Sequence, residues 1–143
     1  RARALAKRLD NAPLAIVDKR RDKPGSSEVM NIIGDVSGRA CIMIDDIVDS
    51  GGTLCNAAQA LIDGGATSVS AYITHGVLSD PAVERLKKSP ISRVVLTNTI
   101  PLPKEKRIDK IEVLSVAKII ADALAAVFEE TSVSELFGGE NLA

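Results

Sequence analysis

Two adjacent carboxylates, about a third of the way along the chain, are the first residues that could do chemistry. Asp45 and Asp46 come directly after the apolar run at residues 40–44. Neighbouring carboxylates can accept hydrogen bonds from a pair of vicinal hydroxyls or help to hold a hydrated Mg²⁺. Two buried acids without partners would cost several kcal/mol, so the pair indicates either a ligand site or a solvated acidic turn.

A glycine-containing turn follows two residues later and leads into a helical pattern. It consists of Asp49, Ser50, Gly51, Gly52 and Thr53. Glycines let the backbone approach a phosphate closely, the two hydroxyls can donate to it, and the N–H groups at a helix start face an anion. No lysine follows the glycines and the spacing is not GxGxxG, so neither common nucleotide loop is present. The turn predicts a phosphate site, although glycine turns between strand and helix are common.

A basic segment lies nearer the start of the chain. Residues 18–27 include Lys19, Arg20 and Arg21, together with Pro, Gly and Ser and no apolar anchor. Such a composition predicts a mobile loop. Its cations could stabilise negative charge on a substrate, or they could form a solvated basic loop.

Strands and helices that alternate along the chain are expected to position these groups. We expect strands at residues 14–17, 29–33, 40–44, 69–74, 93–97 and 111–114, and helices from the start to Pro13 and at residues 53–63, 81–89 and 116–127. This alternation predicts an α/β fold with a mostly parallel sheet and helices on both faces. Ligands of such sheets bind beyond the carboxyl ends of the strands, where Asp45 and Asp46 lie.

Length and composition limit the classes of protein. The 143 residues suit one domain, and 18 Lys+Arg against 19 Asp+Glu provide no overall field for nucleic acid or an anionic membrane. The apolar runs are too short for a membrane span and no signal peptide is visible, so we expect a cytoplasmic protein. Cys41 and Cys55 lack a zinc spacing, and we interpret both as small core residues.

Taken together, the apolar strand, the two acids, two further residues, the turn and the helix resemble a known binding signature. It is the phosphoribosyl diphosphate-binding signature of type I phosphoribosyltransferase-like folds. The resemblance implies that residues 49–53 hold the 5-phosphate of a ribose phosphate. It also implies that Asp45 and Asp46 contact the 2- and 3-hydroxyls, with or without a metal-bound water. The signature gives the ligand class and leaves the reaction open.

Other segments resemble the ribose-phosphate pyrophosphokinase family. They are residues 17–21, 28–34, 74–76, 98–101 and 132–137, so the likeness runs from the first helix to Phe137. The resemblance implies the C-terminal, ribose 5-phosphate-binding half of such an enzyme, as a domain over 1–137 with a tail over 138–143. The chain opens at Arg1 without a Met and already in helical register. We therefore expect that an upstream part, including the first strand of the domain, has been removed.

The family resemblance also implies a reaction. A diphosphoryl group passes from Mg²⁺-bound ATP to C1 of ribose 5-phosphate, giving phosphoribosyl diphosphate and AMP for nucleotide biosynthesis. Lys19 and Arg21 match the catalytic basic pair of the family's flexible loop. The resemblance places most of the ATP site in the missing half, and it implies a homo-oligomer. Ser132, Ser134 and Phe137 match a regulatory phosphate or ADP site between subunits, with a capped C-terminal turn as the alternative.

Two other functions remain open. A nucleobase phosphoribosyltransferase would use the same signature but needs a hood that stacks a base, and no segment offers aromatics for it. A non-catalytic regulatory relative tends to lose the loop cations or the acids, and Lys19, Arg21, Asp45 and Asp46 are all present. His75 is the only histidine, and we expect a structural role for it. We expect the chain alone to bind ribose 5-phosphate weakly and to be inactive.

Overall fold

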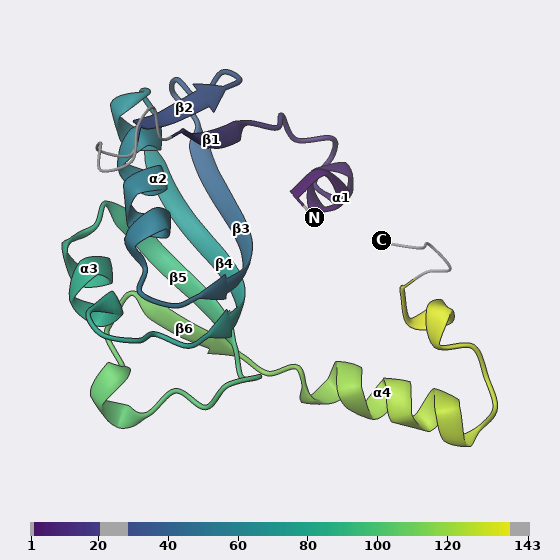
Figure 1. Ribbon diagram of the computed structural model, residues 1–143. Helices are drawn as coiled ribbons and strands as arrows, with labels where there is room; N and C mark the ends of the chain where they lie inside the picture. Colours follow the sequence, from purple (N-terminus) through teal and green to yellow (C-terminus); the bar gives the residue numbers. More distant parts are fainter. Residues whose placement is uncertain (1, 21–28, 138–143) are drawn as a thin grey trace.

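A four-stranded parallel sheet in the order β3-β4-β5-β6 lies at the centre of the computed structural model, which describes residues 2–20 and 29–137 (Figure 1). The strands are β3 (Ala40–Val48), β4 (Ser68–Gly76), β5 (Ile91–Thr97) and β6 (Ile111–Leu114). Helix α2 (Gly52–Asp63) joins the first pair, helix α3 (Ala82–Lys88) the second, and a loop with the short 3-10 turn η1 (Lys104–Lys106) the third. The predicted α/β class, with a parallel sheet flanked by helices, is confirmed.

Helices α2 and α3 pack side by side against one face of this sheet, whereas the sequence predicted helices on both faces. The buried core joins both helices to the central strands β4 and β5. Its members on α2, α3, β4 and β5 are Leu54, Ala58, Leu61, Val69, Ala71, Ile73, Ala82, Leu86, Ile91, Val94 and Leu96. In β4 the buried residues alternate with less buried ones, as the two-residue period of a strand requires. Val48, the last residue of β3, belongs to the same core, which therefore holds the carboxyl end of β3 and the N-terminus of α2 in a fixed relation.

Strand β3 is longer than its apolar run predicts. Parallel pairing with β4 continues to Val48, which lies opposite Gly76. Asp45 and Asp46 consequently lie within the last part of the strand, whereas the sequence interpretation placed them just after it. The ladder hydrogen bonds to a neighbouring strand outweigh the low strand propensity of two aspartates here.

The first two strands form a hairpin separate from the main sheet. Strand β1 (Ile16–Arg20) pairs with β2 (Val29–Ile33) in antiparallel register, with Lys19 opposite Met30. The predicted first strand at residues 14–17 is therefore displaced towards the charged segment. Two strands without a crossover helix between them can pair readily only in antiparallel fashion. The rest of the predicted mobile loop, residues 21–28, lies outside the described residues.

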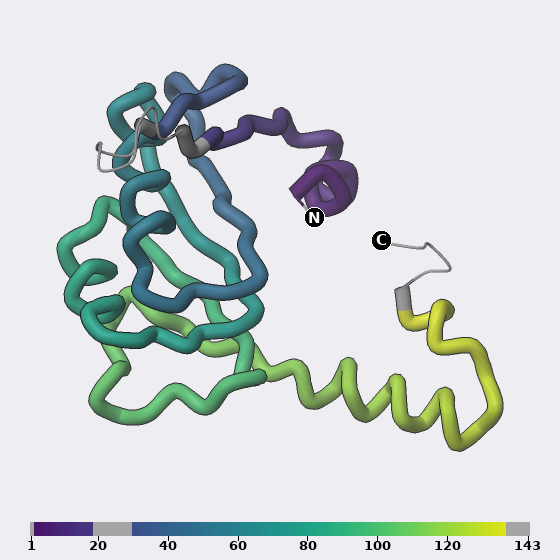
Figure 2. Tube along the Cα trace, viewed as in Figure 1, coloured from purple at the N-terminus to yellow at the C-terminus, as the bar shows by residue number. Residues whose placement is uncertain are grey.

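Both ends of the described chain carry helices that stand off the sheet. Helix α1 (Ala2–Arg8) lies beyond β3, and α4 (Ala117–Phe128) runs away from the sheet to the short 3-10 helix η2 (Val133–Phe137) (Figure 2). The predicted apolar face of α4 is largely exposed, at Ile119, Ile120, Leu124 and Val127. Within the described ranges, no helix combines the length and apolar character that crossing a membrane requires.

Candidate functional site

The junction between β3 and α2 brings the glycine turn to the N-terminus of a helix. Gly51 is the N-cap of α2, is buried, and has φ 71° and ψ 0°. This left-handed conformation is open to glycine and costs other residues about 1–2 kcal/mol. The N–H of Cys55 donates to the Gly51 carbonyl at 3.0 Å, which begins the helical hydrogen bonding.

No side chain caps α2. The N-cap residue is a glycine, and no side-chain cap hydrogen bond forms. The first turn of a helix carries N–H groups that no carbonyl of the same helix can accept, and the helix dipole adds positive potential there. The junction therefore offers an anion a set of backbone donors in a fixed orientation. Ser50 is exposed beside these donors.

The two aspartates lie on the strand that leads into this turn. Successive residues of a strand point to opposite faces, so the carboxylates of Asp45 and Asp46 leave the strand on opposite sides. A carboxylate oxygen of Asp45 accepts the backbone N–H of Asp46 at 2.9 Å. Asp45 is exposed and Asp46 half-buried. A sugar that used both carboxylates would have to lie across the end of β3.

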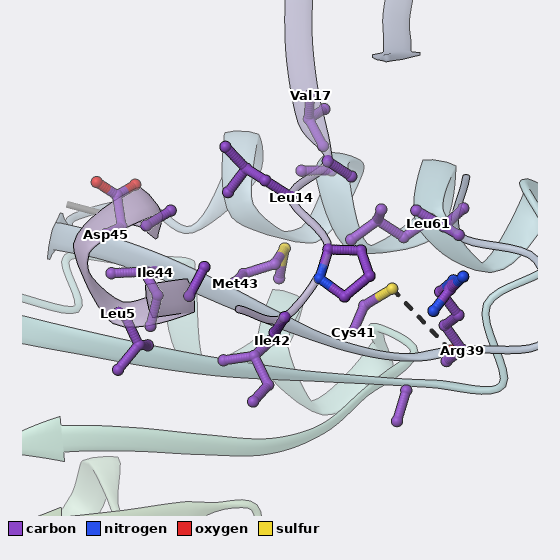
Figure 3. A pocket seen from close by; sticks show the side chains of 18 of the residues that line it. Leu5, Leu14, Val17, Arg39, Cys41, Ile42, Met43, Ile44, Asp45 and Leu61 are labelled. Carbon is purple, nitrogen blue, oxygen red and sulfur yellow. Dashed lines mark hydrogen bonds between the residues drawn. The ribbon is translucent and has the colours of Figure 1, made fainter. Parts of the chain in front are cut away.

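A cavity of about 670 Å³ lies beside the acidic strand end, between α1, β3 and α2. Its wall is mostly aliphatic, and Asp45 and Thr53 both belong to it. Figure 3 shows Asp45 at one end of this wall, near Ile44, and Arg39 at the other end. The aliphatic part offers nothing that would recognise a sugar hydroxyl, so the polar end near Asp45 and Thr53 is the part that suits the predicted ligand.

Helix α3 contacts the glycine turn from a distant part of the sequence. Arg85 donates a hydrogen bond from Nη1 to the carbonyl of Ser50 at 2.9 Å. A Cβ built on Gly52 would lie 3.3 Å from that same nitrogen, and one on Gly51 would lie 3.7 Å from Ala82. Sequence reasoning missed this contact. No motif marks Arg85, and only the packing of α3 beside α2 brings it to the turn.

The single histidine has a hydrogen-bonded, structural environment. His75 lies near the end of β4, where its Nδ1 is 2.8 Å from the hydroxyl of Thr99. That hydroxyl also donates to the carbonyl of Thr74 at 3.0 Å. The imidazole thus ties β4 to the loop after β5, and the structural role expected for it stays a prediction.

The thiol of Cys55 lies in the first turn of α2. Burial raises the pKa of this thiol. The hydrogen bond from Ser89 and the nearby charges of Arg85 and Lys110 lower the pKa, but by less. The thiol therefore remains protonated at neutral pH, as a small core residue would. Cys41 is also free, and burial raises the pKa of its thiol too.

The remaining predicted site residues lie apart from this junction. Lys19 belongs to β1, where its backbone alone is described, and Arg21 lies outside the described residues. The hydroxyls of Ser132 and Ser134 are 2.7 Å apart at the start of η2, the element that ends at Phe137. Among the residues that the structure describes, no three His, Cys, Asp or Glu side chains gather as metal ligands would.

Comparison with known proteins identifies relatives over nearly the whole chain. Residues 6–138 match the family described as the phosphoribosyl synthetase-associated domain. The chain is 60% identical over 137 residues to a protein of Caldanaerobacter subterraneus subsp. tengcongensis named ribose-phosphate pyrophosphokinase, covering 96% of this chain and 43% of that protein. A protein of the same name from Clostridium acetobutylicum is 55% identical over 140 residues, covering 98% and 44%.

A solved structure supports the fold. The crystal structure of phosphoribosylpyrophosphate synthetase from Mycobacterium smegmatis superposes with a TM-score of 0.82 and 41% identity, covering 90% of this chain and 41% of that one. The chain therefore spans less than half the length of these relatives. The covered fractions say how much of each relative the chain matches but not which part of it. They therefore do not support the narrower expectation that the chain is a C-terminal half.

Proposed function

Because this chain belongs to the phosphoribosyl synthetase-associated domain family, we propose that it forms the ribose 5-phosphate-binding part of a ribose-phosphate pyrophosphokinase. That enzyme would transfer a diphosphoryl group from Mg²⁺-bound ATP to C1 of ribose 5-phosphate, releasing AMP. The observation that carries the proposal is the junction of β3 and α2, where a left-handed glycine opens a helix directly after an acidic strand end.

The 5-phosphate of the sugar would lie against the turn of residues 49–53. Backbone N–H groups of the first turn of α2 and the hydroxyls of Ser50 and Thr53 would donate to its oxygens. Asp45 and Asp46 would accept hydrogen bonds from the 2- and 3-hydroxyls. The carboxylates that would accept from sugar hydroxyls lie on β3, and the groups that would donate to the phosphate lie on the turn and on α2. A ribose phosphate likewise carries its 2- and 3-hydroxyls and its 5-phosphate at different ends.

A magnesium ion suits this arrangement only with help from substrate oxygens. Mg²⁺ commonly binds through one or two carboxylates, several waters and substrate phosphates, and the strand end supplies two carboxylates. Asp45 and Asp46 would hold the ion through its waters. When bound, the ion neutralises charge on the phosphates of ATP.

The basic pair Lys19 and Arg21 would act on the transferred group. Negative charge spreads over the phosphoryl oxygens during transfer, and cations that close over the site stabilise it. Lys19 is anchored by the β1–β2 hairpin, so its backbone position is set by pairing with Met30. The hairpin thus supports one end of the proposed catalytic loop.

The rest of the enzyme would supply what this chain lacks. Since the chain spans 43–44% of the length of relatives named ribose-phosphate pyrophosphokinase, we infer that most of the ATP site lies in further residues of a longer polypeptide, the full-length enzyme. The chain alone would bind ribose 5-phosphate weakly without turnover.

The exposed apolar residues of α4 are consistent with the proposed homo-oligomer. A regulatory phosphate or ADP site at Ser132, Ser134 and Phe137 stays a prediction.

Product analysis tests this function. The full-length enzyme, given ribose 5-phosphate and Mg²⁺-ATP, is expected to release AMP and phosphoribosyl diphosphate in equal amounts. Incubation with phosphoribosyl diphosphate and each nucleobase is expected to give no nucleotide. Nucleotide formation in the second assay would assign the chain to the nucleobase phosphoribosyltransferases, and no product in either assay would favour a regulatory relative.

A further inference from the structure

Helix α3 holds the turn that we have proposed for the 5-phosphate, and Arg85 is the residue that makes the connection. Its Nη1 donates to the Ser50 carbonyl at 2.9 Å, across 35 positions of sequence. We propose that Arg85 is a positioning residue for ribose 5-phosphate, which fixes the donors of the turn before the ligand arrives. This inference rests on the proposed function of the turn and names a residue outside its motif.

The geometry of the peptide explains why one hydrogen bond matters. The Ser50–Gly51 peptide is planar, and in its trans form the carbonyl and the N–H point to opposite sides. A carbonyl held on the side of α3 therefore directs the Gly51 N–H away from α3. Two consecutive glycines follow Ser50, and an unrestrained glycine pair samples many backbone conformations. The bond from Arg85 selects one of them.

Helix α3 is itself firmly placed, so that it can act as a support. The Nζ of Lys110 donates to the carbonyls of Leu86, Lys87 and Ser89, at 2.8–3.1 Å, which caps the C-terminal end of α3. The side chain of Leu86 is fully buried in the core. Arg85 is thus presented by a helix that is fixed at its end and along its inner face.

Charge on α3 also favours the contact. The one acid of this helix, Glu84, is paired with Lys87 at 2.7 Å, so it does not compete for the guanidinium. A hydrogen bond from a charged donor is stronger than one between neutral groups. The positive charge of Arg85, beside Gly51 and Gly52, adds to the potential that an anionic phosphate meets at the helix start.

Substitution in the full-length enzyme tests the proposal. Arg85→Gln is expected to raise KM for ribose 5-phosphate about tenfold, since a charge-assisted hydrogen bond that orders the turn is lost, while kcat changes less than about threefold. Arg85→Lys keeps the charge and a donor and is expected to recover part of the loss. Lys88→Gln removes the same charge at the last residue of the same helix, and it is expected to leave both constants within about twofold of wild type.

Amide exchange in the ligand-free enzyme gives a readout that does not depend on activity. The peptide spanning residues 48–54 is expected to exchange faster in Arg85→Gln than in wild type, with an unchanged thermal midpoint. A higher KM with unchanged exchange would mean that Arg85 contacts the phosphate directly, and the positioning role would be wrong. Unchanged KM and exchange would also refute it. If the wild-type enzyme bound no ribose 5-phosphate, the proposed function would be wrong. The exchange measurement would still show whether Arg85 orders the turn.

Discussion

Lys19→Ala in the full-length enzyme is expected to lower kcat for phosphoribosyl diphosphate formation about hundredfold, as removal of a donor to developing charge does in other enzymes. The physical reason is that the ammonium group would stabilise charge on the transferred phosphoryl oxygens, which is greatest in the transition state. KM for ribose 5-phosphate should change little, because the sugar phosphate is held by the turn at residues 49–53. Initial rates of AMP release measure both constants.

A neighbouring cation provides the matched control. Arg20 shares strand β1 with Lys19 but does not match the basic pair of the family's loop. Arg20→Ala should therefore keep kcat within about threefold of wild type, as surface charges contribute little. If Lys19→Ala also stayed within about threefold, or if both substitutions lowered kcat equally, the specific role of Lys19 would be refuted.

Gly51→Ala is expected to raise KM for ribose 5-phosphate by more than about tenfold, because the turn must leave the left-handed conformation or bear a strain of about 1–2 kcal/mol. Gly51 has φ +71°, and a Cβ there would make only ordinary contact with Ala82, at 3.7 Å. The effect therefore comes from the backbone conformation rather than from a steric clash. Steady-state kinetics with varied ribose 5-phosphate measure it.

The substitution Gly38→Ala is the control that distinguishes a loss of stability from a loss of ligand binding. Gly38 has φ +69°, and a Cβ there would meet nothing within 4 Å, so Gly38→Ala carries the same backbone strain away from the site. Both variants should lose a similar free energy of unfolding in urea, about 1–2 kcal/mol, while only Gly51→Ala raises KM. Equal KM values for the two variants would show that the conformation of Gly51 does not matter for the ligand.

Much of the central fold could be predicted because its signals are local. The apolar run at residues 40–44 and the helical pattern from Thr53 to Asp63 each follow from the period with which side chains meet the core. The order of acids, turn and helix predicted a ligand site at a strand end, and the structure brings these parts together at the N-terminus of α2. The left-handed conformation of Gly51 gives a physical reason for a glycine there.

The features that sequence reasoning missed depend on pairing between distant segments. Strand β3 extends to Val48 because β4 offers ladder partners as far as Gly76, which no local pattern in Asp45 and Asp46 indicates. Arg85 reaches Ser50 only through the packing of α3. Likewise, periodicity predicted the apolar face of α4 but carries no information on what covers that face.

Amide chemical shifts of the chain, followed during titration with ribose 5-phosphate, test most directly whether the junction of β3 and α2 binds a phosphorylated ribose. We expect shift changes concentrated at residues 45–53 with ribose 5-phosphate, smaller changes restricted to residues 50–53 with inorganic phosphate, and none with ribose. Because NMR detects weak binding, the test needs no turnover. Changes centred elsewhere in the chain, or no change with ribose 5-phosphate, would show that the junction of β3 and α2 is not the binding site.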